Sequence, residues 1–330
     1  MINPTSAEIL CNGKRIGEAN HYRREKRDNG VHKSFPSATR RLEGRYLWGG
    51  MVFNQFGHFV VESPARLWAL PDGGCEGVVM VPSGGGRDDL RVYERALFDF
   101  WGVDIPIHLL NEPTEIEDLL IPGQAFGLGE IARGTPEHRD WMRRAADRVE
   151  PEGAELVYIS RGKLKSGRGQ VLLEDAIERN LERCGYRIYD PQRDTISQQL
   201  AQFKKARHIL GLDSSAFHLA GLVAHPGQRY GIILRRNMAA YVSIQLQLEG
   251  MGAAVEVFNV LDADWIPARQ SGPNAFSWGE LDLNALGTAL AENGFIPAEF
   301  DWQTPTPEQH DEAVEEMVRQ HRGKIARVAV

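Results

Sequence analysis

The sequence predicts an α/β fold in two domains. Past residue 152, short apolar segments alternate with amphipathic segments, which is the pattern of strands joined by helical crossovers. The composition is 42% hydrophobic and 25% charged, so the chain can bury a core and is neither mostly disordered nor a coiled coil. Its 330 residues exceed the roughly 250–300 that one hydrophobic core usually serves. We therefore expect an N-terminal domain over residues 1–152 and a C-terminal domain over residues 153–330.

The first domain opens with a polar, Gly-rich region in which we expect only short strands, around 7–10 and 46–53. The run from His21 to Lys33 is too charged to form a core segment. A helix is expected after Phe56-Gly57-His58, with Pro64 in its first turn, because apolar residues then recur on one face. The further elements are a strand at 77–81, a helix at 92–101, strands at 105–110 and 115–122, and a helix at 136–149.

The second domain has the more regular alternation. Its expected strands are 156–160, 186–190, 208–212, 230–234 and 255–260, and its expected helices are 174–184, 196–206, 215–224 and 241–250. Strands separated by helices of this length imply right-handed crossovers and a parallel, doubly wound sheet. Two trailing helices are expected at 282–293 and 307–320, and the second either packs back across the domain junction or remains a solvated appendage.

Charge and cysteine content exclude several classes of protein. The net charge of −7 argues against a nucleic-acid-binding protein, because phosphate binding needs a basic face. Residues 161–207 are an exception, with eleven Lys or Arg against six Asp or Glu, and this stretch either faces an anionic small molecule or forms solvated helix faces. Cys11, Cys75 and Cys184 are too few and too widely spaced for a disulfide framework or a zinc cluster, so free thiols are expected.

Targeting segments are also not evident. The apolar stretches fall short of the roughly 20 residues that a membrane-spanning helix needs. The first ten residues lack a basic region followed by an apolar run. We expect a soluble, cytoplasmic protein.

The most informative segment is residues 208–227. A strand ends at Leu212, a turn of small residues follows at Asp213-Ser214-Ser215, and a helix starts at once. Free backbone N–H groups and the helix dipole at such a turn suit a diphosphate. The alternative is that Asp213 or Ser214 is an ordinary N-cap and that the helix residues are core.

A second group of residues follows the strand at 156–160. Ser160 and Arg161 end that strand and lead into a loop with Gly162, Lys163 and Arg168, and Glu174 opens the next helix. A doubly wound sheet places its ligand contacts at this position, and the planar guanidinium of Arg161 suits phosphate oxygens. The alternative is an exposed basic loop.

The third group lies in the first domain. His58 and Glu62 are four residues apart, so on a helix they share a face. Such a pair can take a proton from an attacking hydroxyl, with the carboxylate orienting the imidazole. The alternative is a structural histidine that is merely hydrogen-bonded.

Several familiar motifs are absent from the sequence. Ser83-Gly84-Gly85-Gly86 lacks the Lys-Ser/Thr of a P-loop, and residues 127–134 lack the G-x-G-x-x-G spacing after a strand. The chain contains no G-x-S-x-G elbow and no H-E-x-x-H sequence. A P-loop kinase, a nicotinamide dehydrogenase, a serine hydrolase and a zinc protease are therefore disfavoured.

Together, the three groups resemble glycosyltransferase family 61, the DUF563 or capsular-polysaccharide biosynthesis type, over roughly residues 45–235. The first-domain signature of this family corresponds to Gly57-His58-Phe59-Val60-Val61-Glu62 followed by Pro64-Ala65-Arg66-Leu67. The second-domain pattern corresponds to Tyr158-Ile159-Ser160-Arg161, then Arg168, Glu174 and Gly185-Tyr186. Gly211-Leu212-Asp213-Ser214-Ser215-Ala216 resembles the turn in the family, and no acid lies in Tyr230–Arg236, where many two-domain transferases hold the donor ribose.

The resemblance implies the GT-B architecture, two Rossmann-like domains facing across a cleft, with the acceptor on the first and the sugar nucleotide on the second. It implies an inverting glycosyltransferase that needs neither metal nor cofactor. The donor is a nucleoside diphosphate sugar, taken as UDP-linked, and the acceptor is a hydroxyl of a glycan or of a lipid-linked glycan, which leaves peripheral membrane contact open.

In that scheme His58 or Glu62 removes the acceptor proton. Arg161 and Lys165 or Arg168 neutralise the diphosphate, and the turn Asp213, Ser214, Ser215 and Ala216 cradles it. The alternatives are a sugar-nucleotide epimerase or hydrolase on the same fold, and a non-catalytic protein that binds nucleotide sugars.

Overall fold

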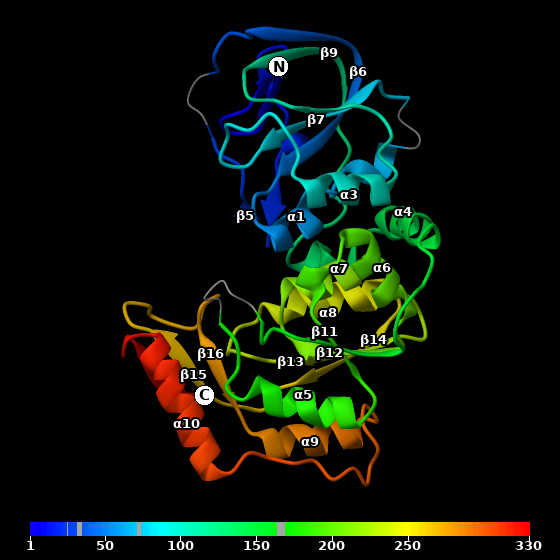
Figure 1. The fold of residues 1–330 in the computed structure, drawn as a ribbon. Helices are drawn as coiled ribbons and strands as arrows, with labels where there is room; N and C mark the ends of the chain where they lie inside the picture. The colour runs from blue at the N-terminus through cyan, green and yellow to red at the C-terminus, as the bar shows by residue number, and fades with distance from the viewer. Residues whose placement is uncertain (25, 32–34, 71–73, 164–168) are drawn as a thin grey trace. The chain divides into compact units, whose positions relative to one another are not determined.

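The structure is a computed structural model that describes residues 1–330 apart from 25, 32–34, 71–73 and 164–168 (Figure 1). The chain forms two compact units. The first unit comprises Met1–Glu150, His218–Val223 and Leu246–Met251. The second unit comprises Pro151–Phe217, Ala224–Gln245 and Gly252–Val330. Helices and parallel strands occur in both, so the α/β class predicted from the sequence is confirmed.

The first unit contains a mixed sheet. Strands β6 (Arg40–Val52), β7 (Gly77–Pro82), β8 (Ile107–Leu109) and β9 (Thr114–Leu120) run parallel to one another. Strands β1 (Ile2–Asn3), β2 (Glu8–Cys11) and β3 (Lys14–Arg15) join the β9 edge of this group in antiparallel fashion. Strand β6 is much longer than the expected strand at 46–53, because its charged first half pairs with β9. In spatial order the strands are β3 (Lys14–Arg15), β2 (Glu8–Cys11), β1 (Ile2–Asn3), β9 (Thr114–Leu120), β6 (Arg40–Val52), β7 (Gly77–Pro82) and β8 (Ile107–Leu109). A separate hairpin joins β4 (Tyr22–Arg23) and β5 (Lys26–Arg27).

Helix α1 (Phe56–Glu62) differs from the prediction. It begins at Phe56 rather than after His58, and it ends before Pro64 instead of containing it. Proline has no N–H group to donate within a helix. Further helices in the described part of Met1–Glu150 are α3 (Val92–Trp101), α4 (Pro136–Asp147), η1 (Gly17–Ala19), η2 (Leu67–Ala69) and η3 (Glu130–Arg133).

The second unit is built on a parallel sheet, as predicted. In spatial order its strands are β11 (Arg187–Tyr189), β10 (Leu156–Ile159), β12 (His208–Leu212), β13 (Arg229–Ile233) and β14 (Ala254–Phe258). Helices α5 (Glu174–Arg183) and α9 (Leu283–Glu292) cover one face of this sheet, and α6 (Ile196–Lys205) lies on the other (Figure 1). A short helix, η4 (Pro191–Arg193), precedes α6. The carboxyl ends of the parallel strands meet at one edge.

One helix connects β12 to β13, and another connects β13 to β14. Helix α7 (Ser215–Ala220) ends four residues earlier than the predicted boundary at 224, because the chain continues in tight turns from Leu222 to Leu219 and from Val223 to Ala220. Helix α8 (Tyr241–Gly250) has the predicted bounds. Both helices contribute residues to each of the two units.

The tail of the chain forms a sheet that the sequence did not predict. Strands β16 (Trp278–Leu281), β15 (Leu261–Pro267) and β17 (Ile325–Ala329) pair antiparallel in that order. Helix α10 (Pro307–Gln320) packs on this sheet through Met317, which is 2% exposed and lies in a cluster with Trp265 and Ile325. This helix therefore packs within the second unit through one face, while most of its other side chains are exposed.

Two further expectations can be compared with the structure. Cys11, Cys75 and Cys184 form no disulfide. Among the described residues, every helix is too short or too polar to cross a membrane.

Candidate active site

Helix α1 places His58 and Glu62 side by side in the first unit. The helix is short, and it is held in place by the burial of Phe59, Val60 and Val61. The spacing of four residues brings Nδ1 of His58 within 2.5 Å of Oε2 of Glu62. The contact that the sequence predicts within this pair is therefore present.

Glu62 is also held by residues from a distant segment. Nε2 of His21 lies 2.9 Å from Oε1 of Glu62, and Arg23 donates from Nε to Oε1 and from Nη2 to Oε2, each over 2.8 Å. The Glu62 side chain is fully buried. We call His21, Arg23, His58 and Glu62 the Glu62 cluster.

The cluster decides the protonation state of Glu62. Burial by itself would raise the pKa of this carboxyl, but the hydrogen bonds from His21, His58 and Arg23 outweigh it and hold the pKa far below its usual range. Glu62 is therefore an ionised acceptor near neutral pH, and both of its oxygens already accept hydrogen bonds, which favours His58 over Glu62 as a base.

The same argument assigns the tautomer of His58. Because the ionised Glu62 can only accept, Nδ1 of His58 carries a proton in this contact, so the neutral form of this imidazole has its lone pair at Nε2. None of the described residues hydrogen-bonds to Nε2 of His58, whose side chain is 32% exposed. The imidazole is thus oriented by its carboxylate and can accept a proton at Nε2.

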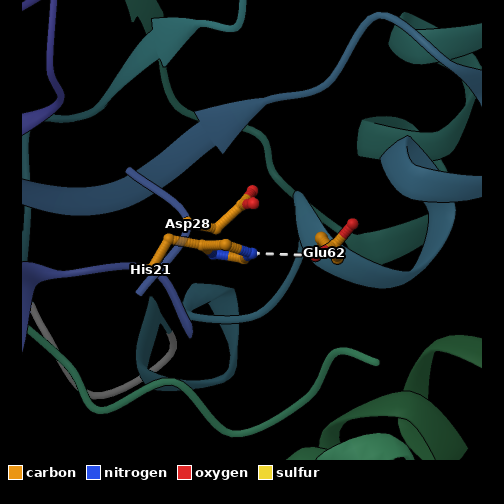
Figure 2. Close-up of side chains that lie close together, drawn as sticks. All are labelled: His21, Asp28 and Glu62. Atoms are coloured by element: carbon orange, nitrogen blue, oxygen red, sulfur yellow. Dashed lines mark hydrogen bonds and ion pairs between the residues drawn. The ribbon is translucent and has the colours of Figure 1, made fainter. Parts of the chain in front are cut away.

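The first unit also contains the one group of possible metal ligands found among the described residues. Ligand atoms of His21, Asp28 and Glu62 lie within 4.8 Å of one another, and Figure 2 shows His21 pointing at Glu62 with Asp28 beside it. Arg23, however, already spans the two acids, since its Nη1 donates to Oδ1 of Asp28 over 3.2 Å. A divalent ion would have to displace this guanidinium.

In the second unit, Ser160 and Arg161 follow strand β10 as predicted. The Arg161 N–H donates to Oε1 of Glu174 over 2.7 Å, and its Nη2 donates to the carbonyl of Gly169 over 3.0 Å. The Ser160 hydroxyl donates to Glu178 on α5 over 2.5 Å. Lys165 and Arg168, which were predicted to join this site, lie outside the described residues.

Glu174 is an unusual acid at the start of α5. It is 5% exposed, and Oε1 also accepts from the Tyr158 hydroxyl over 3.2 Å, while Oε2 has no hydrogen-bond partner among the described residues. Burial, with a smaller contribution from the nearby Glu178, raises the pKa of Glu174 to about 7 against the opposing effect of the Arg161 N–H group. Glu174 therefore titrates near neutral pH.

The turn after β12 has two kinds of residue. Ser214, Ser215 and Ala216 are half-buried at the carboxyl edge of the sheet. Asp213 is only 2% exposed, and its carboxylate pairs with Nε of Arg235 and Nε of Arg236, each over 3.3 Å. The structure thus ties Asp213 to two arginines that sequence reasoning did not select.

Arg235 and Arg236 come directly after β13 and Leu234. Arg235 is 4% exposed, and its Nη1 reaches the Gly169 carbonyl over 3.3 Å, the same carbonyl that Arg161 contacts. Three arginines therefore lie at the carboxyl ends of β10 and β13, on either side of β12. We call Arg161, Arg235 and Arg236 the arginine edge, and the positive charge gathered there is suited to a polyanionic ligand.

Sequence reasoning missed the other residues for identifiable reasons. His21 and Arg23 stand in the charged run that was excluded from the core, and they reach Glu62 across 41 and 39 residues. Arg235 and Arg236 stand in the segment Tyr230–Arg236, where an acid that holds the donor ribose was expected and none is present. A pair of adjacent arginines directly after a buried strand was the signal available for the second site.

Comparison with known families finds a match over the middle of the chain. The family model described as Glycosyltransferase 61 matches residues 56–230, which is more than half of the 330 residues. The match begins at the first residue of α1 and ends within β13, so it includes His58, Glu62 and Arg161. None of the curated proteins compared with the chain matches it.

Proposed function

The chain belongs to glycosyltransferase family 61 and is therefore a glycosyltransferase. We propose that it transfers a sugar with inversion of configuration at the anomeric carbon. The donor is a nucleoside diphosphate sugar, UDP-linked, and the acceptor is a hydroxyl of a glycan or of a lipid-linked glycan. The observation that supports this most directly is the His58–Glu62 pair, in which an ionised carboxylate orients an imidazole whose Nε2 can accept a proton.

The proposed reaction is a single displacement. The acceptor oxygen forms a bond to the anomeric carbon while the bond from that carbon to the phosphate oxygen breaks, and the diphosphate leaves with the electron pair. Nε2 of His58 takes the acceptor proton, and Glu62 stabilises the imidazolium that results. Glu62 thereby acts on the reaction through His58.

The leaving diphosphate needs positive charge. We assign this task to Arg161, together with Lys165 or Arg168 and the backbone amides of Ser214, Ser215 and Ala216. In this proposal the second unit is the donor domain and the first is the acceptor domain of a GT-B enzyme, which works in the cytoplasm.

Metal independence is part of the same proposal. Arginines supply the charge at the arginine edge, and Arg23 already occupies the acidic groups around Glu62. The reaction therefore needs no divalent ion to offset the diphosphate.

Product analysis tests the function. We expect incubation with a panel of UDP-sugars and glycan acceptors to yield a glycoside whose anomeric configuration, measured by NMR, is opposite to that of the donor. A product with retained configuration would contradict the single displacement. Free sugar alone would identify a hydrolase, and a donor with a changed sugar would identify an epimerase.

A further inference from the structure

We propose that Arg236 is a second arginine that binds the donor diphosphate and that Asp213 acts as its positioning residue. This inference rests on the proposed function, because it assumes a diphosphate donor. It changes the role of Asp213, which the sequence placed among the direct contacts.

The first step is the position of Arg236 in the sheet. Strands β12 and β13 are parallel neighbours, with Leu212 opposite Ile233, and the Asp213 N–H donates to the Ile233 carbonyl over 3.0 Å. Arg236 therefore leaves the sheet at the same edge as the turn after β12. Because β12 lies between β10 and β13, that turn is flanked by Arg161 on one side and Arg236 on the other.

The second step is the difference between the two adjacent arginines. Arg235 is almost completely buried, and its guanidinium is directed at the carbonyls of Asp213 and Gly169 over 3.0 and 3.3 Å. The Arg236 side chain is 12% exposed and is held through Nε by Oδ2 of Asp213. Among the described residues, none accepts a hydrogen bond from Nη1 or Nη2 of Arg236, so these two donors are available to a ligand.

The third step is the role of Asp213. A buried carboxylate would repel a diphosphate if it touched one, but this carboxylate binds one arginine through each of its oxygens. Arg236 is thus held in place before the ligand arrives, so less side-chain freedom is lost on binding. A planar guanidinium fixed at Nε presents its remaining N–H groups to two oxygens at once, which suits a diphosphate.

The nearby acids balance the charge of the two arginines but do not take up the Nη donors of Arg236. The carboxylate of Asp264 is 2% exposed and accepts the Asn237 N–H over 3.1 Å. With Asp213, it offsets the charge of Arg235 and Arg236, which lets the pair remain at the edge of the core. The ligand's own hydrogen bonds to Arg236 then supply the affinity.

Calorimetry with UDP and with inorganic pyrophosphate tests the proposal. We expect Arg236→Gln to weaken both probes about tenfold or more, the range for charge-assisted hydrogen bonds. Arg236→Lys should recover part of the loss, because it restores the charge without the fork. Arg207→Gln is the matched control, because Arg207 is 71% exposed and precedes the opposite end of β12, and it should leave both affinities unchanged.

A double-mutant cycle tests the positioning role. If Asp213 acts through Arg236, Asp213→Asn should weaken pyrophosphate binding in the wild-type background and have little effect in the Arg236→Gln background. Equal effects in both backgrounds, or tighter binding by Asp213→Asn, would overturn the role of Asp213. Urea unfolding of each variant checks that the second unit remains folded.

The outcomes separate this inference from the proposed function. Wild-type affinity in Arg236→Gln would overturn the inference and leave a diphosphate donor in place. If the wild-type protein binds pyrophosphate but not UDP, and Arg236→Gln loses that binding, the inference holds and the UDP donor is wrong. Binding of neither probe by the wild-type protein would overturn both.

Discussion

At the scale of single residues, Glu62 determines what its neighbours can do. Its carboxylate accepts hydrogen bonds from two histidines and one arginine, and it has no exposed surface. The low pKa that results makes Glu62 a poor base, and in the proposed mechanism that task belongs to His58. Sequence spacing identifies the pair, but the division of labour within it depends on His21 and Arg23.

Substitutions of His58 and of Glu62 should both lower kcat but should differ in their effect on stability. His58→Ala should lower kcat by about 10²–10⁴, the usual cost of losing a general base, and should leave folding nearly unchanged because the side chain is 32% exposed. His310→Ala is the matched control, since His310 also lies beside a carboxylate and its side chain is 38% exposed. Near-wild-type turnover of His58→Ala would move the base elsewhere.

Glu62→Gln should lower kcat as well, because an amide no longer dictates which nitrogen of His58 carries the proton. Unlike His58→Ala, it should also destabilise the protein by about 1–2 kcal/mol, since it removes the buried anion that Arg23 binds through two hydrogen bonds and leaves Asp28 as the ion-pair partner of Arg23 among the described residues. Urea unfolding measures this difference. Full stability of Glu62→Gln would mean that the Glu62 cluster contributes little to the fold.

At the scale of elements, the start of α5 has two opposing effects on one acid. A carboxylate in the first turn of a helix is favoured by the helix dipole, which lowers its pKa. Glu174 is in that position, yet its pKa is raised to about 7, because burial has the larger effect. The same side chain holds the Arg161 N–H, so the proton on Glu174 lies next to the arginine edge.

The raised pKa of Glu174 predicts how the free energy of unfolding depends on pH. A carboxyl whose pKa is raised from 4.5 to about 7 on folding contributes stability that is complete below pH 4.5 and is lost as the pH rises to 7. The loss should amount to about 3 kcal/mol in the wild-type protein. Unfolding free energies measured between pH 4.5 and 8 should show this decline, and Glu174→Gln should remove most of it.

Asp175→Asn provides the control for that experiment. Asp175 lies in the same turn of α5, but its side chain is 63% exposed. Its removal should leave the pH dependence as it is in the wild-type protein. An unchanged slope in Glu174→Gln would show that other groups produce the decline.

At the scale of the whole molecule, arginines contribute positive charge at both candidate sites, and in the proposed function this charge takes the place of a metal. The net charge is −7, yet both candidate sites are built around arginines that bind buried acids. In the first unit Arg23 bridges Glu62 and Asp28, and in the second unit Asp213 bridges Arg235 and Arg236. Each arrangement satisfies the buried charges within the protein itself.

Transfer activity should therefore survive chelation. We expect the same rate of product formation in excess EDTA as in buffer with added manganese, since no step in the proposal uses a divalent ion. Activity that disappears in EDTA and returns with manganese would contradict metal independence. It would direct attention to His21, Asp28 and Glu62 as ligands.

Much of the fold was predictable from local patterns. Apolar periodicity and small-residue turns between 77 and 260 located the strands and helices of both sheets to within a few residues, because these signals come from neighbours in the chain. The tail was not predicted, because β15 pairs with β17 across about 60 residues, and each strand is short and partly polar. Such pairings depend on what the rest of the fold places beside them.

The same division applies to the candidate sites. The sequence by itself determined the family, the helical spacing of His58 and Glu62, and the position of Arg161 at the end of a strand. Only the tertiary structure decided that His21 and Arg23 bind Glu62 and that Asp213 binds Arg235 and Arg236. The physical reason is that backbone periodicity is set by adjacent residues, whereas the protonation and orientation of a buried side chain are set by charges that folding brings together from distant segments.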